Sequence, residues 1–185
     1  MAITDLDLVP GRACGDCTAC CVVMAIDQPD IRKAAGVACR HCRGGCAIYP
    51  TRPPVCRDFH CGWRQLPILD EPWRPDLSGV FVEIEQRDGE TVLSLVLIGN
   101  PLKTVRQDWF QDFIATGIKG GVTLDLGVLG PPGHQGASLP LNTRQMLAAC
   151  GKRAALKAEL EHELKRLRAY RCEPRHFRHN GPDFG

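Results

Sequence analysis

Nine of the eleven cysteines in this chain fall between residues 14 and 61, namely Cys14, Cys17, Cys20, Cys21, Cys39, Cys42, Cys46, Cys56 and Cys61. The first four follow the spacing Cys-x-x-Cys-x-x-Cys-Cys. From Val9 to Gln65 the sequence contains no leucine, so little ordinary hydrophobic core is available there. Ordering the backbone costs roughly 1–2 kcal/mol per residue, and apolar burial in this stretch cannot easily offset it. The pattern therefore predicts a module held together by a thiolate-bound metal.

The charge balance points to no polyanionic partner. The formal net charge is only +2, and it counts every cysteine as neutral, whereas metal-bound cysteine is a thiolate. Residues 39–64 carry an excess of arginine over acidic residues, with Arg40, Arg43, Arg52, Arg57 and Arg64 against Asp58. This excess either offsets the negative charge of a thiolate cluster or forms a solvated basic face.

The cysteines are expected to be reduced. The N-terminal residues are acidic and lack the basic and apolar regions of a signal peptide, and no stretch is long enough to span a bilayer. We therefore expect a cytoplasmic chain, in which structural disulfides are rare. Adjacent Cys20 and Cys21 also have α-carbons only about 3.8 Å apart, below the usual disulfide range.

Composition and hydrophobic periodicity divide the chain into a cysteine-rich module, a connector, an α+β domain and a tail. Residues 11–66 are predicted to be a loop-rich, cysteine-bound metal module, with one short helix from Gln28 or Pro29 to Ala35 that ends at Gly36. Residues 66–76 contain three prolines and are predicted to be an extended connector. Residues 77–170 have the pattern of an α+β domain, and residues 171–185 form a basic, irregular tail.

Residues 77–170 predict the order β-β-α-β-α. Alternation over 80–85 and a nearly continuous apolar run over 91–98 indicate two strands joined by the hairpin signal Asp88-Gly89. Asn100 and Pro101 are expected to begin a helix that ends at Gly117. A third strand is predicted over 122–128, followed by a Gly/Pro-rich loop over 130–136. A long helix capped by Asn142 should then bury one face, comprising Met146, Ala149, Cys150, Leu156, Leu160, Leu164 and Leu167.

Two fused Cys-x-x-Cys turns begin the cysteine-rich stretch. Such a turn can place two sulfurs on one metal, because the backbone amides between them can donate to the sulfurs. Consecutive side chains diverge, so Cys20 and Cys21 are expected to serve different metals or a bridged pair. Cys39, Cys42 and Cys46 form a second closely spaced group, and Cys56 and Cys61 complete the set after a Pro-Pro turn. Closely spaced cysteines in a reducing compartment have few explanations other than a metal.

These motifs resemble the YkgJ-type cysteine cluster family. The resemblance covers roughly residues 11–66 and rests on the four-cysteine run together with Cys46-Ala-Ile-Tyr-Pro-Thr-Arg-Pro-Pro-Val-Cys56-Arg-Asp-Phe-His-Cys61-Gly-Trp63. It implies a zinc- or iron-chelating domain with Cys14, Cys17, Cys20, Cys21, Cys46, Cys56 and Cys61 as ligands. Spacing before Cys46 varies in the family, so Cys39 and Cys42 are added from their own chelating turn.

Several metals would suit these ligands. Zinc accepts four thiolates, so that eight thiolates make about two closed sites. Iron–sulfur clusters also use four cysteines, although here Cys21 follows Cys20 at once instead of after the three-residue gap of a bacterial ferredoxin. Copper(I) also favours soft thiolates. About two zinc ions per chain are expected, with iron or an iron–sulfur cluster as the alternative.

Each residue beside the cysteines has two possible roles, one at the metal site and one in ordinary packing or at the surface. Tyr49, Phe59 and Trp63 are expected to form an apolar lid over the sulfurs, or simply to pack; Arg52 or Arg57 would donate to thiolates. His41 and His60 neighbour ligands but are more often surface histidines. Cys150 is expected in the helical core, and Cys172 outside the cluster.

The sequence therefore predicts a metal-binding protein whose cysteine cluster is structural and serves as a scaffold. The alternatives are an iron–sulfur oxidoreductase or electron carrier, and a metal-handling protein; no catalytic motif decides between them. A protein partner remains open, whereas membrane and nucleic-acid binding are not expected, because the arginines of 166–178 fit a solvated helix end better.

Overall fold

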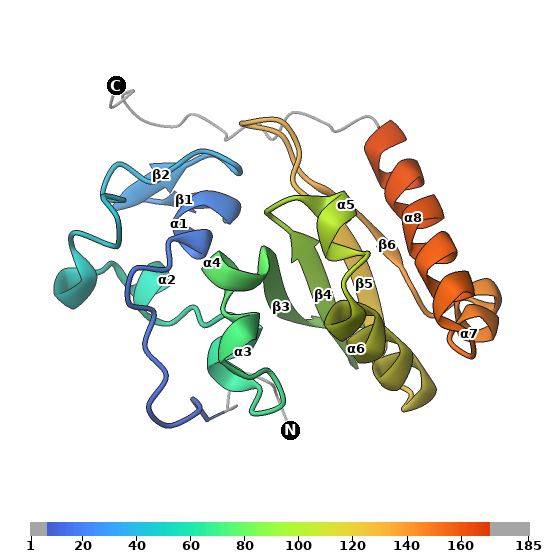
Figure 1. Cartoon of the computed structure of the whole chain (residues 1–185). Coiled ribbons are helices and arrows are strands. Elements are labelled where there is room, and N and C mark those ends of the chain that lie inside the picture. The colour runs from blue at the N-terminus through green and yellow to red at the C-terminus, as the bar shows by residue number, and fades with distance from the viewer. Residues whose placement is uncertain (1–6, 171–185) are drawn as a thin grey trace.

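The structure of the chain, a computed structural model, describes residues 7–170. It is mixed α+β, with a two-stranded and a four-stranded sheet (Figure 1). The predicted tail over 171–185, which includes Cys172, lies outside the described residues. No helix in the described range is both long and apolar enough to cross a membrane.

The four-stranded sheet has the order β3-β4-β5-β6. Its strands are β3 (Val80–Arg87), β4 (Glu90–Leu97), β5 (Thr123–Val128) and β6 (Ala137–Pro140). β4 and β5 are parallel and the other neighbours are antiparallel. The predicted Asp-Gly hairpin is confirmed: Asp88 and Gly89 both have positive φ, at 52° and 82°, as a type I′ turn requires.

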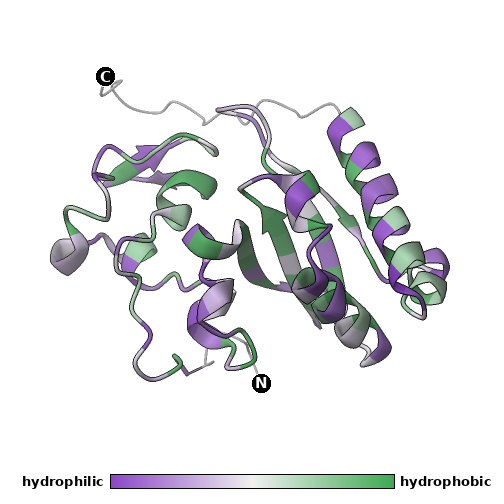
Figure 2. Ribbon diagram, in the orientation of Figure 1, coloured by the Kyte–Doolittle hydropathy of each residue, from purple (hydrophilic) through white to green (hydrophobic). Residues whose placement is uncertain are grey.

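Helices of the C-terminal half cover one face of this sheet. They are α5 (Pro101–Thr104), α6 (Asp108–Lys119), α7 (Arg144–Ala149) and α8 (Arg153–Ala169). The apolar residues of strands β3–β5 that face them make the main core, and Figure 2 shows the hydrophobic colour gathered in these strands and on the inner side of α8. All seven residues of the predicted helical face, from Met146 to Leu167, are buried.

Several predictions about these helices are wrong in detail. The single helix expected from Asn100 and Pro101 to Gly117 is two helices, α5 and α6. α6 also continues to Lys119 instead of ending at Gly117; a Cβ on Gly117 would lie 3.1 Å from Leu124 Cδ1, so glycine there permits close packing of helix on strand. The long C-terminal helix is two helices, and Thr143, not Asn142, caps the first by accepting from the Met146 amide. Asn142 instead bonds the β5 backbone at Val122 and Leu124.

The cysteine-rich part contains short elements only. These are α1 (Ala19–Val23), β1 (Ile26–Gln28), β2 (Ile31–Lys33), η2 (Tyr49–Thr51), α2 (Pro54–Arg57) and α3 (Gly62–Gln65). The helix predicted from residue 28 or 29 to Ala35 is wrong, because this segment is the turn and second strand of the β1–β2 hairpin. Pro29 and Asp30 occupy the turn, and the β-branched Ile26 and Ile31 suit the strands.

The predicted extended connector over 66–76 is folded. It contains η3 (Glu71–Trp73) and the start of α4 (Pro75–Ser78), and Leu69 and Trp73 are buried in the main core. Its two large apolar side chains outweigh the three prolines that suggested an open chain.

The cysteine-rich part packs on the face of the sheet that the C-terminal helices leave uncovered. Phe81 and Val96, which are paired across β3 and β4, point to that side and form a second small core with Ala19 and Val23 of α1. Trp63 of α3 instead enters the main core. The two parts of the chain thus share buried residues.

Candidate metal centre

The nine cysteines of the N-terminal part come from separate short elements. Cys14 and Cys17 lie before α1, and Cys20 and Cys21 lie within it. Cys39, Cys42 and Cys46 follow β2, Cys56 is in α2, and Cys61 precedes α3. Hydrogen-bonded turns close two of the three predicted Cys-x-x-Cys segments: the Cys17 amide donates to Cys14 O and the Cys42 amide to Cys39 O, each over 2.9 Å. None of the ten cysteines in the described residues forms a disulfide.

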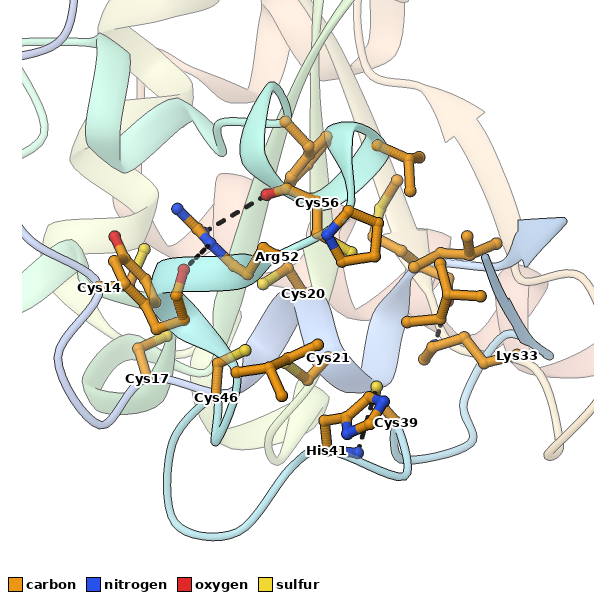
Figure 3. Close-up of a pocket in the computed structure, with 18 of the residues that line it drawn as sticks. Cys14, Cys17, Cys20, Cys21, Lys33, Cys39, His41, Cys46, Arg52 and Cys56 are labelled. Atoms are coloured by element: carbon orange, nitrogen blue, oxygen red, sulfur yellow. Dashed lines mark hydrogen bonds between the residues drawn. The ribbon is translucent and has the colours of Figure 1, made fainter. Parts of the chain in front are cut away.

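Seven of these cysteines line one pocket with a volume of about 110 Å³. They are Cys14, Cys17, Cys20, Cys21, Cys39, Cys46 and Cys56 (Figure 3). The other two lie beside it: the side chain of Cys42 is hydrogen-bonded with that of Cys21, and Cys61 packs with Cys17 and Cys20 against the second core. Cys150 is buried in the main core, as predicted.

Their mutual contacts divide the thiols into two sets. Cys14, Cys17, Cys20 and Cys61 form the first thiol set: Cys61 interacts electrostatically with Cys14 and Cys17, and Cys17, Cys20 and Cys61 all pack against the second core. The side chain of Cys20 is also hydrogen-bonded with that of Cys21. Cys21, Cys39, Cys42, Cys46 and Cys56 form the second, in which Cys21 contacts Cys42, and Cys56 interacts with Cys21, Cys39 and Cys46. Adjacent Cys20 and Cys21 join the two sets. In Figure 3 Cys14 and Cys17 lie toward one end of the pocket and Cys39 toward the other.

Burial keeps several of these thiols protonated. It raises the pKa of Cys17 to about 11 and also raises the pKa values of Cys56 and Cys61. A hydrogen bond with Cys20, followed by burial, raises the pKa of Cys21. Nearby thiols add to the shift, since one thiolate disfavours the next. A bound cation is what would turn such a group into thiolates at neutral pH.

Two basic residues face the thiols, and one of them, Lys33, was not predicted from the sequence. Lys33 lines the pocket and is only 7% exposed; its ammonium donates to the carbonyls of Val22, Met24 and Ala34. Arg64 lies at the first set, where Nη1 donates to Cys14 Sγ over 3.4 Å. Arg64 belonged to the predicted excess of arginine. Lys33 faces the pocket because alternate residues of the β1–β2 hairpin point to the same side, and this hairpin was not predicted from the sequence.

The arginines predicted to donate to thiolates bond elsewhere. Arg52 donates to the carbonyls of Tyr49 and Cys56 and lies 3.7 Å from the Tyr49 ring centroid, so that it fixes the loop instead of a sulfur. Arg57 pairs with Asp58 at the surface.

The aromatic and histidine neighbours behave differently from one another. Tyr49 and Phe59 line the pocket, as expected of a lid. Trp63 does not, because it is buried in the main core with its indole N–H donating to Asp70 O. His41 lines the pocket, and its backbone amide donates to Cys39 Sγ over 3.5 Å, whereas His60 is not among the lining residues.

The donor set suits a thiophilic metal, but the thiols are not drawn together into a finished site. Within residues 7–170 no group of three or more His, Cys, Asp or Glu side chains is already arranged to hold a metal ion. The sulfurs meet in pairs, and most of these cysteines keep some solvent exposure. Metal binding at this pocket would require its short loops to close around the ion.

No protein-family model, no curated protein and no solved structure matches this chain.

Proposed function

We propose that this protein binds metal through its N-terminal cysteines, with zinc as the favoured ion at about two per chain and iron or an iron–sulfur cluster as the alternative. One observation carries the proposal: seven free cysteines from separate short segments line one pocket, and Cys42 and Cys61 lie beside it. So many closely spaced free thiols have few explanations other than metal binding. The proposal agrees with the resemblance to the YkgJ-type family and with a structural, scaffold-like role.

The two thiol sets suggest how the ligands are shared. The first set offers four sulfurs, enough for one tetrahedral Cys₄ site, and the second offers five, one more than a second site needs. Cys20 and Cys21, whose side chains are hydrogen-bonded with each other, then serve different ions or a bridged pair of ions. When bound, the metal supplies a positive centre that holds the short loops together.

The protein's own residues balance the charge. Four thiolates on a divalent ion leave a net charge of −2, which is costly in a partly buried site. Lys33, held by three carbonyls beside the second set, and Arg64, bonded to Cys14 in the first, lower that cost. Such neighbouring groups tune a metal site nearly as strongly as its ligands do.

Metal content of cysteine-to-serine variants tests this division. Cys61→Ser should lose about one ion, because the first set has no spare sulfur. Cys42→Ser combined with Cys56→Ser should lose the other ion, because only three sulfurs remain in the second set. Adding Cys14→Ser to Cys61→Ser should cost nothing more, because both belong to the first set, whereas Cys61→Ser combined with Cys42→Ser and Cys56→Ser should remove both ions. Cys150→Ser, in the main core, is the matched control and should keep full metal content.

Two outcomes would count against the proposal in different ways. A wild-type protein that holds no metal after anaerobic purification would overturn metal binding itself. Loss of all metal in Cys61→Ser alone would keep metal binding but show one shared cluster instead of two sites.

The partial exposure of the thiols favours a second candidate, metal handling. Of the nine cysteines only Cys39 is buried, and structural zinc sites are closed. If the protein passes metal on, a chelator should remove the ions within minutes from the folded chain. Retention for many hours would favour the structural role.

A further inference from the structure

A second cavity, of about 360 Å³, lies on the same side of the sheet as the cysteine pocket but is separate from its thiols. It is lined by β3–β6, by residues 23–25 and 35–36, and by the β5–β6 loop over 129–136. The Gly133 amide donates to Ala35 O over 2.9 Å and ties that loop to the cysteine-rich part. Val23, Met24, Val96 and Leu129 give the cavity apolar walls.

Glu83 puts a carboxylate on the wall of this cavity. It is partly buried, and no hydrogen bond or ion pair from within residues 7–170 reaches its side chain. Burial, with a smaller contribution from Glu85, raises its pKa to about 7. A carboxylate in such a place costs free energy unless a cation accompanies it.

Two further oxygens lie beside Glu83 across the sheet. Ser94 is its partner on β4 and lines the cavity; it is 4% exposed, and its hydroxyl has no hydrogen-bond partner in the described part of the chain. Asp125 follows on β5 in the same row. Its Oδ2 accepts from Arg87 over 2.8 Å, whereas its buried Oδ1 has no partner there. The row Glu83–Ser94–Asp125 thus presents acceptors that the described residues leave unused.

The charges around the row define what it could bind. Arg87 donates to both Glu85 and Asp125, so three carboxylates and one guanidinium leave two negative charges, and Glu83 is paired with no cation of the described residues. A hard divalent ion needs six or more oxygen ligands, several of them carboxylate or water, and the apolar walls do not supply these. A carboxylate without a paired cation, a hydroxyl acceptor and an apolar wall match a small organic ammonium ion.

We propose that this cavity binds a primary alkylammonium compound, with the ammonium on Glu83 and Ser94 and the alkyl chain against Met24 and Val96. No thiol lines this cavity, although Met24 and Ala25 line both it and the cysteine pocket. The cavity therefore adds a ligand class that the cysteine cluster does not explain.

Calorimetric titration of the full chain with n-butylammonium at pH 8 tests the proposal, with 1-butanol as the neutral probe of the same size. Butylammonium should bind at least tenfold more tightly than the alcohol, a preference of about 1.4 kcal/mol. Glu83→Gln, which keeps the shape and removes the charge, should abolish that preference, and Ser94→Ala should weaken butylammonium several-fold. Glu90→Gln, at the exposed start of β4, is the control and should bind as the wild type does.

Several results would overturn the proposal. These are equal binding of alcohol and ammonium, wild-type affinity in folded Glu83→Gln, or no ammonium binding at millimolar concentration. Displacement of butylammonium by low concentrations of Ca²⁺ or Mg²⁺ would instead assign the acidic row to a hard cation.

Discussion

At the scale of single residues, Lys33 shows how the fold serves the thiols. A lysine is rarely buried without partners, yet this one is 7% exposed and gives its hydrogens to three carbonyls instead of a carboxylate. Burial lowers its pKa, while Cys39 and other thiols act in the opposite direction. Its ammonium is therefore a fixed positive charge beside the second thiol set.

Lys33→Met should weaken metal binding while keeping the shape of the side chain. Loss of a neighbouring group that tunes a metal site costs about 10–100-fold in affinity, which competition with a chromophoric chelator would measure. Arg32→Met is the matched control, because Arg32 is the next residue, is exposed and pairs with Asp27 instead of facing the pocket. Equal affinities in both variants would show that Lys33 does not compensate the thiolates.

Glu83 predicts a pH-dependent stability. Its pKa rises from 4.5 to about 7 on folding, so the folded state holds the proton more tightly than the unfolded chain does. The stabilising contribution of this proton to the free energy of unfolding is fully present below pH 4.5 and is lost as the pH rises through about 7. Charged or titratable neighbours on the surrounding elements are Glu85, Arg87, Asp125 and His134.

Glu83→Gln should therefore be more stable than the wild type at pH 8, by about 1–2 kcal/mol after allowance for partial exposure. At pH 4 the two proteins should differ little. Urea unfolding at both pH values measures this difference, and a wild type that gains stability from pH 5 to pH 8 relative to the variant would contradict the assignment.

At the scale of elements, the sequence predicted best what the main core dictates. Apolar patterns in the sequence determine which residues are buried in the strands at 80–87, 90–97 and 123–128 and on the inner face of α7 and α8. The elements it missed are set by pairing with the rest of the fold. β6 is a four-residue edge strand that ends at Pro140, and the β1–β2 hairpin has strands of three residues, too short for a period to be read.

The docking of α3 on β3 is the tightest junction between the two parts of the chain. A Cβ on Gly62 would lie 2.6 Å from Val82 Cγ1 and 2.9 Å from Val82 Cβ, so glycine is required there for close approach. The same junction places Trp63 in the main core and Cys61 among the thiols of the first set.

Gly62→Ala should destabilise the fold by about 1–3 kcal/mol, the usual cost of overpacking. Gly151→Ala is the control, because a Cβ there would meet its nearest neighbour, Ala148 O, at 3.8 Å. Thermal unfolding of the two variants measures the difference, and a Gly62→Ala variant as stable as Gly151→Ala would mean that α3 can shift away without cost.

At the scale of the whole molecule, the cysteine-rich part is attached to the sheet instead of standing alone. Phe81 and Val96 of the sheet form a small core with the cysteine-rich part, and Trp63 of the cysteine-rich part packs into the main core. The spacing of the cysteines indicated that they would gather, and they do gather around one pocket. Which thiols neighbour one another could not be predicted, because it depends on how the loops over 34–48 and 58–62 return to α1.

The most direct test of the account is the metal content of the wild-type chain, purified anaerobically, together with its absorption spectrum. The account predicts about two zinc ions per chain and no visible band, since zinc has a filled d shell. A brown protein with a broad charge-transfer band and acid-labile sulfide would contradict the zinc assignment and support an iron–sulfur cluster. A colourless protein without metal, its thiols all open to alkylation, would contradict the central claim that these cysteines form a metal centre.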